Sequence, residues 1–261
     1  MFHLLEINLF LLVFFMSLFN WAMTFFGASL VYFVKKESQK LISGALGLSA
    51  GIMIAASFFS LLLPAVLQLS ENKIQLLIVP CSFFTGGLFL RLCDKFLPHE
   101  HLLSHEIEGP HAALSKNKLL LLAMTLHNIP EGLAVGIAFA CAKQNLIPAI
   151  ILSAGIGIQN FPEGTAISLP LHKSGMSKLQ ATMYGQFSAL VEIPSALIGF
   201  IFASFFHNIL PFALSFAAGA MMFVCIEELI PEANATKEID TGTISFMIGF
   251  IIMMTLDIIF G

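Results

Sequence analysis

Long uncharged segments recur along the whole chain, separated by charged residues or turn-forming residues. A helix that crosses a bilayer needs about 20 consecutive apolar residues, and eight segments provide that length. We expect them at 6–35, 40–71, 74–92, 118–143, 143–173, 179–207, 211–226 and from 240 to the end. The division between the sixth and seventh falls at the turn-forming residues His207, Asn208 and Pro211. This pattern predicts an all-α, polytopic membrane protein with eight transmembrane helices in a single domain over residues 1–261.

The composition agrees with this prediction. Hydrophobic residues make up 57% of the chain and charged residues 11%, with a mean hydropathy of +0.91, whereas soluble domains carry about 25% charged residues. The 27 phenylalanines against two tyrosines and one tryptophan are typical of side chains that face lipid or pack without water. A net charge of −4 excludes nucleic acid as a partner and leaves the lipid bilayer as the expected surroundings.

The distribution of basic residues predicts the orientation. Ten of the 12 Lys and Arg residues lie in the loops that follow odd-numbered spans, and two lie on the opposite side. Because loops rich in Lys and Arg stay in the cytoplasm, both termini are expected outside it, in a plasma or inner membrane. The first span lacks the basic region of a signal peptide and is expected to be retained.

The longest hydrophilic segment, about residues 98–117, is expected to be a flexible cytoplasmic loop. It contains His99, His101, His105 and His111. Imidazoles at this density can hold a transition metal weakly. The alternative is a solvated linker that happens to be rich in histidine, and composition alone leaves both interpretations open.

A polar hexapeptide occurs twice, once in the fourth and once in the fifth predicted span. The sequence HNIPEG over residues 127–132 recurs as QNFPEG over residues 159–164. Consecutive spans run antiparallel, so the two copies form an inverted repeat that could meet near the membrane midplane. Spacings of three and four residues place the polar side chains of each copy on one sector of its helix. These side chains are His127, Asn128, Glu131, Gln159, Asn160 and Glu163.

The remaining residues of the hexapeptides shape the backbone. Pro130 and Pro162 cannot donate a hydrogen bond to the carbonyl four residues earlier, so each leaves a free oxygen beside the polar sector. Gly132 and Gly164 permit close approach of a neighbouring helix. A purely structural interpretation, with a kink and polar contacts between helices, competes with a functional one.

The buried acidic residues indicate a bound cation. An ionised carboxylate at the bilayer centre costs on the order of 2.5–3.5 kcal/mol. No Lys or Arg lies in the interior of any predicted span to offset Glu131, Glu163 and Glu192, and Arg91 near the end of the third span comes closest. Protonation would account for one buried glutamate, but it does not explain the imidazole and amides around the pair. Such mixed ligands suit Zn²⁺, Fe²⁺, Mn²⁺, Co²⁺ or Cd²⁺, and the affinity order favours zinc among the first-row ions.

Sequence motifs decide between a pump, an enzyme, a channel and a carrier. No GxxxxGK[ST] sequence is present, which excludes an ATP-driven pump. The HExxH motif of a membrane metalloprotease is also missing, so we expect neither an enzyme nor a catalytic cofactor, with the metal ion as the transported substrate. A cation or proton channel that uses the same carboxylates remains the alternative to a carrier.

At these positions the sequence resembles the ZIP (Zrt- and Irt-like) divalent metal transporters, in particular their GufA-like branch. The resemblance rests on SAGIM at 49–53, the two PEG motifs, GQF at 185–187 leading to Glu192, and EELIPE at 227–232. It implies eight helices with both termini outside, a homodimer, and transport of divalent metal into the cytoplasm by alternating access.

The resemblance also implies particular ligands. One metal site would use His127, Glu131, Gln159 and Glu163, with Met53 nearby, and an adjacent second site would use Asn128, Asn160 and Glu192 and share the first two glutamates. Asn160 stands where several relatives have aspartate, which weakens the second site, and Gln159 replaces a histidine. Exit-side ligands would be Asp94, Glu227 and Glu228, with His99 and His101 in the loop; the alternative for the three acids is a solvated helix end.

Overall fold

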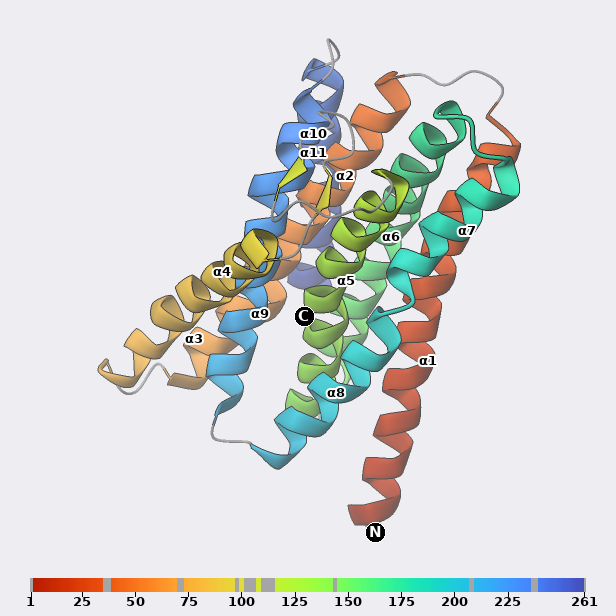
Figure 1. Cartoon of the computed structure of the whole chain (residues 1–261). Helices are drawn as coiled ribbons and strands as arrows, with labels where there is room; N and C mark the ends of the chain where they lie inside the picture. The colour runs from red at the N-terminus through yellow and green to blue at the C-terminus, as the bar shows by residue number, and fades with distance from the viewer. Residues whose placement is uncertain are drawn as a thin grey trace.

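The computed structural model describes residues 2–34, 39–69, 73–96, 99–100, 107–108, 116–142, 145–206, 209–235 and 239–260. These residues form a bundle of long helices (Figure 1). The α-helices are α1 (Phe2–Ala28), α2 (Gln39–Ala56), α3 (Leu63–Leu69), α4 (Ile78–Phe96), α5 (Lys116–Cys141), α6 (Ile147–Lys173), α7 (Lys178–Ala189), α8 (Glu192–Phe205), α9 (Leu210–Val224), α10 (Ile230–Asn234) and α11 (Ile239–Phe260). The 3₁₀-helices η1 (Ser29–Tyr32) and η3 (Gln75–Leu77) and the π-helices η2 (Ser57–Leu62) and η5 (Cys225–Leu229) adjoin them.

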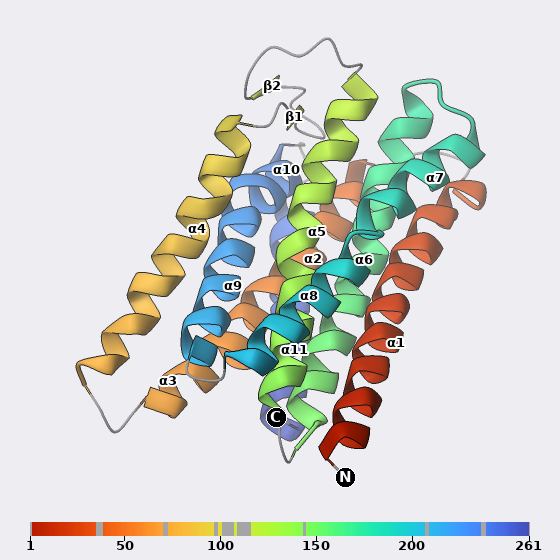
Figure 2. The ribbon, with the colours of Figure 1, turned by 60° about the horizontal axis from the view of Figure 1, so that its bottom comes forward.

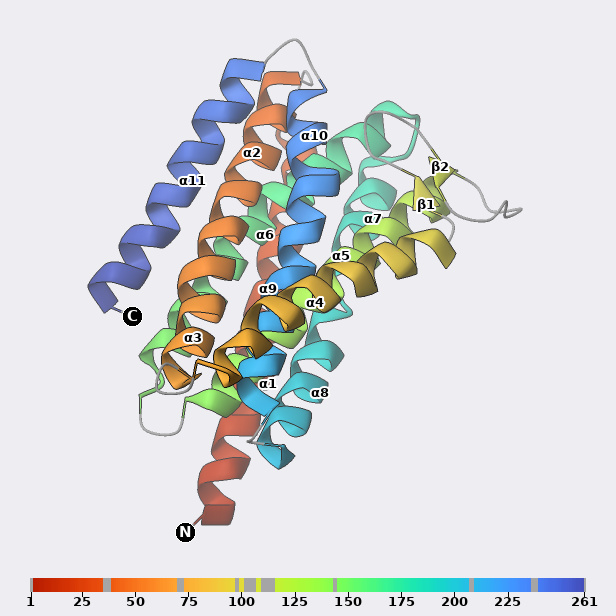
Figure 3. The same cartoon turned by 90° about the vertical axis from the view of Figure 1, so that its left-hand side faces the viewer.

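Helices far apart in the sequence pack as close pairs. The largest contacts join α2 to α11, α5 to α8, α1 to α6 and α4 to α9, and Figure 3 shows α11 lying along α2. Glycines allow the backbones to approach: Gly136 of α5 meets the Ala196 carbonyl of α8, and Gly47 of α2 meets the Gly242 carbonyl of α11. Close contacts through small residues are typical of helices that associate in lipid.

Six helical segments of the described chain are long and apolar enough to cross a membrane. They are Asn8–Tyr32, Gln39–Leu69, Gln75–Cys93, Lys178–Phe205, Leu210–Asn234 and Asp240–Phe260. Helices α5 and α6 have 26 and 27 residues, and they are not among these six segments of the described chain. The all-helical architecture is therefore confirmed with six candidate membrane-spanning helices among the described residues, and the count of eight and the inverted repeat stay predictions.

The segment that was expected to be a loop contains a short β-ladder. Strand β1 (His99–Glu100) pairs antiparallel with β2 (Ile107–Glu108), with His99 opposite Glu108. The expectation of a flexible loop for this segment stays a prediction, because His101, His105 and His111 lie outside the described residues. Figure 2 shows the ladder at one end of the bundle, and the N-terminal end of α1 and the C-terminal end of α11 at the other.

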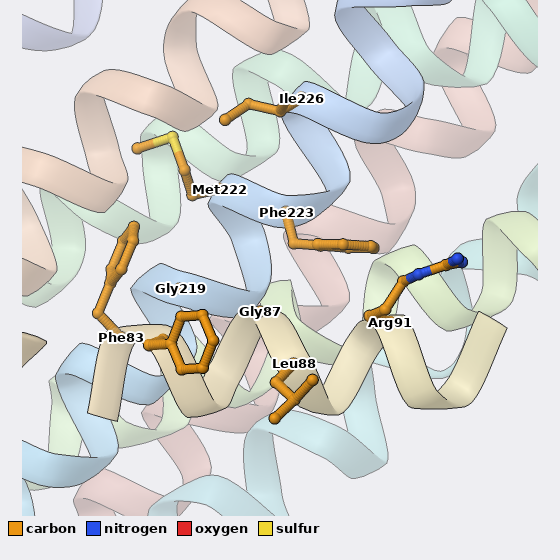
Figure 4. Close-up of a pocket in the computed structure, with 9 residues that line it drawn as sticks. Phe83, Gly87, Leu88, Arg91, Gly219, Met222, Phe223 and Ile226 are labelled. Carbon is orange, nitrogen blue, oxygen red and sulfur yellow. The ribbon is translucent and has the colours of Figure 1, made fainter. Parts of the chain in front are cut away.

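An apolar groove lies on the outside of the bundle between α4 and α9. It has a volume of about 320 Å³, and Figure 4 shows Phe83, Gly87 and Phe223 along it, with Arg91 at its end. Phe84 beside it exposes 69% of its surface. Such an apolar outer face is expected where a helix pair contacts lipid rather than water.

Adjacent glycines in α4 provide a matched test of the packing between α4 and α9. A methyl group on Gly86 would overlap the Phe216 carbonyl of α9, whereas one on Gly87 would lie 3.5 Å from the Gly219 oxygen, an ordinary contact. We expect Gly86→Ala to destabilise the protein by about 1–3 kcal/mol through overpacking. Gly87→Ala should be neutral or stabilising by up to about 1 kcal/mol, because alanine favours the helix. Melting temperatures of the two purified variants in detergent test this, and equal values would contradict it.

Candidate metal centre

The two hexapeptides bring their polar side chains to the interior of the bundle. Helix α5 carries His127, Asn128 and Glu131, and α6 carries Gln159, Asn160 and Glu163; all six are buried. Glu131 exposes 1% of its surface and Glu163 2%. Neither carboxylate therefore faces lipid, as a polar sector turned inward requires.

Proline and glycine shape each hexapeptide. Pro130 and Pro162 lie inside helices that continue on both sides of them, so each helix loses one backbone hydrogen bond at the centre of its polar motif. Gly132 packs against the backbone of Glu192 at the start of α8, and Gly164 packs against the Thr24 carbonyl of α1. The predicted close approach of neighbouring helices at both glycines is confirmed.

A hydrogen-bond network joins the second hexapeptide to two other helices. Gln159 Nε2 donates to Asn160 Oδ1 at 2.8 Å, and Asn160 Nδ2 donates to Glu192 Oε1 of α8 at 2.8 Å. The same Asn160 nitrogen donates to the backbone oxygen of Asn20 in α1 at 3.3 Å. Asn20 is itself fully buried. Sequence reasoning missed it, although a polar side chain inside an apolar span was the available signal.

The three glutamates of α5, α6 and α8 interact with one another. Glu131 is within electrostatic range of Glu163 and Glu192, and it also contacts the Gln159 side chain. Several buried oxygens here have no hydrogen-bond partner in the part of the chain that the structure describes. They are Asn128 Oδ1, Glu131 Oε2, Gln159 Oε1, Glu163 Oε2 and Glu192 Oε2. Buried acceptors without donors are costly, and a cation would satisfy them.

The carboxylates are not gathered into a complete cluster. Within the described ranges, no group of three His, Cys, Asp or Glu side chains is close enough to hold a metal ion by itself. Carboxylates repel one another when no cation lies between them. A metal ion at this site would therefore need amide ligands, a movement of side chains, or both.

The π-helix η5 brings Glu228 to the first hexapeptide. Its Oε1 atom lies 3.6 Å from His127 Nε2, and Glu228 is buried. This burial rules out the solvated helix end for Glu228 and places its carboxylate beside the first hexapeptide. Glu227 is half-buried. Single-turn π-helices occur frequently at functional sites because they re-aim side chains.

Two further buried residues lie in elements that adjoin this region. Met53 is buried in α2, which packs against α6. Cys225, the first residue of η5, is fully buried and within electrostatic range of Glu131 and Glu163. The sequence indicated only a core cysteine, because nothing local placed it near acids of other helices.

The structure describes little of the remaining candidate ligands. Asp94 belongs to the last turn of α4 and His99 to β1. The structure describes the backbone of both residues but not their side chains. His101 is outside the described residues. Their expected exit-side role stays a prediction.

A bundle of long apolar helices around buried carboxylates and amides defines an integral membrane protein with a polar site between its helices. Comparison with known proteins gives the family. Residues 111–257 match the profile of the ZIP zinc transporter family. The chain is 37% identical to the zinc transporter GufA of Myxococcus xanthus, over 90% of this chain and 93% of that protein.

Two other relatives also belong to the zinc transporters by name. The chain is 32% identical to the zinc transporter ZIP11 of Xenopus tropicalis, over 94% of this chain and 96% of that protein. It is 35% identical to the zinc transporter ZIPB of Bordetella bronchiseptica, over 93% of this chain and 79% of that protein. The chain belongs to the ZIP family, in its GufA-like branch, and this membership confirms the expectation that it is not an enzyme.

Proposed function

We propose that this protein is a secondary transporter that moves divalent transition metal ions, above all Zn²⁺, across the membrane into the cytoplasm by alternating access. The observation that carries the proposal is the group of buried oxygens without hydrogen-bond donors among the described residues of α5, α6 and α8. Acceptors of this kind, next to a buried imidazole, match the mixed ligands that zinc takes. The names of the relatives support the same substrate.

The proposed ligands of the transported ion are His127, Glu131, Gln159 and Glu163, with Met53 as a neighbouring thioether. When the ion enters, Glu131 and Glu163 are drawn together, because the cation replaces their mutual repulsion by attraction. Because the ion takes ligands from both α5 and α6, its binding is coupled to a rearrangement of these two helices.

The membrane arrangement completes the proposal. Helices α5 and α6 also cross the bilayer, since lengths of 26 and 27 residues suffice. The protein then has eight spans with both termini outside the cytoplasm, in a plasma or inner membrane, and it forms a homodimer. In this proposal the two hexapeptides form an inverted repeat, and the ion binds between them near the membrane midplane.

Metal uptake by the purified protein in liposomes tests the function. Zn²⁺, Cd²⁺, Fe²⁺ and Mn²⁺ are supplied separately and in competition, with empty liposomes as the control. A carrier gives a saturable flux and competition between metals. A flux that rises linearly with metal concentration and membrane voltage would instead support the cation channel that uses the same carboxylates.

His127→Ala is expected to raise the half-saturating Zn²⁺ concentration about tenfold or more, since loss of a metal-site partner costs about 10–100-fold in affinity. The measurement is the concentration dependence of uptake. His172→Ala is the matched control, because His172 Nδ1 lies 2.7 Å from the Met176 carbonyl at the end of α6, away from the hexapeptides. An unchanged half-saturating concentration in His127→Ala would show that the imidazole is not a ligand of the transported ion.

A further inference from the structure

We propose that the groove between α4 and α9 binds an anionic phospholipid of the surrounding membrane, with one acyl chain in the groove and the phosphate at Arg91. The site lies on the outside of the bundle, away from the metal centre. The inference therefore goes beyond the proposed function and does not depend on metal transport.

The groove is hollow where Gly87 has no side chain. Glycine is among the least favourable residues inside a helix, so a glycine in the middle of α4 indicates a local requirement. For Gly86 the requirement is packing, because an added methyl group would overlap the Phe216 carbonyl. Packing does not require Gly87, since an added methyl group would lie 3.5 Å from its nearest neighbour, the Gly219 oxygen. What Gly87 preserves is the open floor of the groove.

The groove is apolar along its length and has a cation at its end. Of the described residues that line it, Arg91 alone is ionisable, and the others are apolar or glycine. Figure 4 shows Arg91 at one end and Phe83 at the other. Arg91 is exposed, its guanidinium stays charged, and the planar donors of that group match the oxygens of a phosphate. An apolar channel that ends at a guanidinium is complementary to a molecule with an apolar chain and an anionic head.

The length of the groove matches one leaflet of a bilayer. Phe83 and Arg91 are about 12 Å apart along the axis of α4, at 1.5 Å per residue, and the hydrocarbon of one leaflet is roughly 15 Å thick. Arg91 lies toward the end of α4 that leads to the β-ladder, which the orientation proposed above puts in the cytoplasm. The cytoplasmic leaflet carries the anionic lipids, and basic pockets between helices on that side bind their head groups.

The size of the groove favours a lipid over a protein segment. Its volume of about 320 Å³ is near the lower end of the range for small-molecule pockets, whereas an α-helix with its side chains is about 10–12 Å across. Phe84 and Leu88 beside the groove expose 69% and 44% of their surfaces. A flexible acyl chain adapts to an irregular apolar surface of this kind, and a rigid helix does not.

Lipid binding to the purified protein in detergent tests the contact with the head group. Phosphatidylglycerol and phosphatidylcholine with identical acyl chains are added separately and without metal, and native mass spectrometry measures the bound lipid. We expect phosphatidylglycerol to bind more tightly, and its affinity to fall about tenfold in Arg91→Gln, because hydrogen bonds to charged groups are among the strong ones. Equal affinities for the two lipids, with no change in Arg91→Gln, would overturn the inference.

Lys173→Gln is the matched control for the charge. It removes a positive charge from the exposed last turn of α6, a helix that does not line the groove. The affinity for phosphatidylglycerol should not change in this variant. An equal loss in Lys173→Gln and Arg91→Gln would show attraction to the overall charge of the protein instead of a site at Arg91, and would overturn the inference.

Filling the groove tests the contact with the acyl chain. Gly87→Leu puts a branched side chain into the hollow, whereas Gly87→Ala leaves most of it open. We expect Gly87→Leu to lose the bound lipid and Gly87→Ala to retain it. Lipid that stays bound to a folded Gly87→Leu variant would overturn the inference, because its chain would then lie elsewhere. The result for Arg91→Gln stands even if Gly87→Leu fails to fold.

The competing occupant of the groove is a second copy of this chain. Size-exclusion chromatography with light scattering gives the oligomeric state of the unmodified protein and of Gly87→Leu. An oligomeric state that is the same in both, with phosphatidylglycerol bound only by the unmodified protein, supports the lipid site. A dimer that dissociates in Gly87→Leu, without lipid bound to the unmodified protein, would assign the groove to the contact between copies and overturn the inference.

Discussion

Replacing either Glu131 or Glu163 by glutamine is expected to abolish metal transport. Each substitution keeps the size of the side chain and removes a negative charge from a site where both residues are almost completely buried. Loss of a residue that only supports a ligand already costs about 10–100-fold, so loss of a central carboxylate should lower Zn²⁺ uptake by about 100-fold or more. Initial uptake rates in liposomes measure this directly.

The folded state of these variants should be unaffected. A neutral amide costs less to bury than a carboxylate without a cation, so the melting temperature in detergent should be equal to that of the unmodified protein or higher. Asp240→Asn is the matched control, since it removes a carboxylate from an exposed position in the first turn of α11. If uptake persists in a folded Glu131→Gln or Glu163→Gln variant, that glutamate is not a ligand of the transported ion.

The local part of the site could be predicted from the sequence. Residues three and four positions apart share a helix face whatever surrounds the helix, so the burial of Glu131 together with His127 followed from their spacing. The roles of Gly132 and Gly164 followed in the same way, because a residue without a side chain marks a close approach even when the neighbouring helix is unknown.

The contacts between helices could not be predicted. Asn160 meets the Asn20 carbonyl across 140 positions of the sequence, and nothing near either residue specifies the other. The same holds for Glu228, which the sequence left as either an exit-side ligand or a solvated helix end. The π-helix η5 and the packing of α9 beside α5 bring it to His127 instead. Such contacts depend on the tertiary arrangement rather than on local periodicity.

Gly132→Ala is expected to impair both folding and transport. A methyl group at this position would lie 2.5 Å from the Glu192 carbonyl oxygen, 2.9 Å from Glu192 Cα and 2.8 Å from Ser195 Cβ. Two of these atoms belong to the backbone, so the start of α8 must move away from α5. Overpacking of this kind costs about 1–3 kcal/mol, and the movement also displaces Glu192 from Asn160.

Two measurements together identify this mechanism. The melting temperature in detergent and the Zn²⁺ uptake rate should both fall in Gly132→Ala, whereas Glu131→Gln lowers the uptake rate alone and Gly87→Ala lowers neither. The loss of uptake should exceed what the reduced amount of folded protein explains, because the folded fraction still carries a displaced Glu192. If uptake per folded molecule equals that of the unmodified protein, the contact between Gly132 and Glu192 supports the fold but does not set the geometry of the metal site.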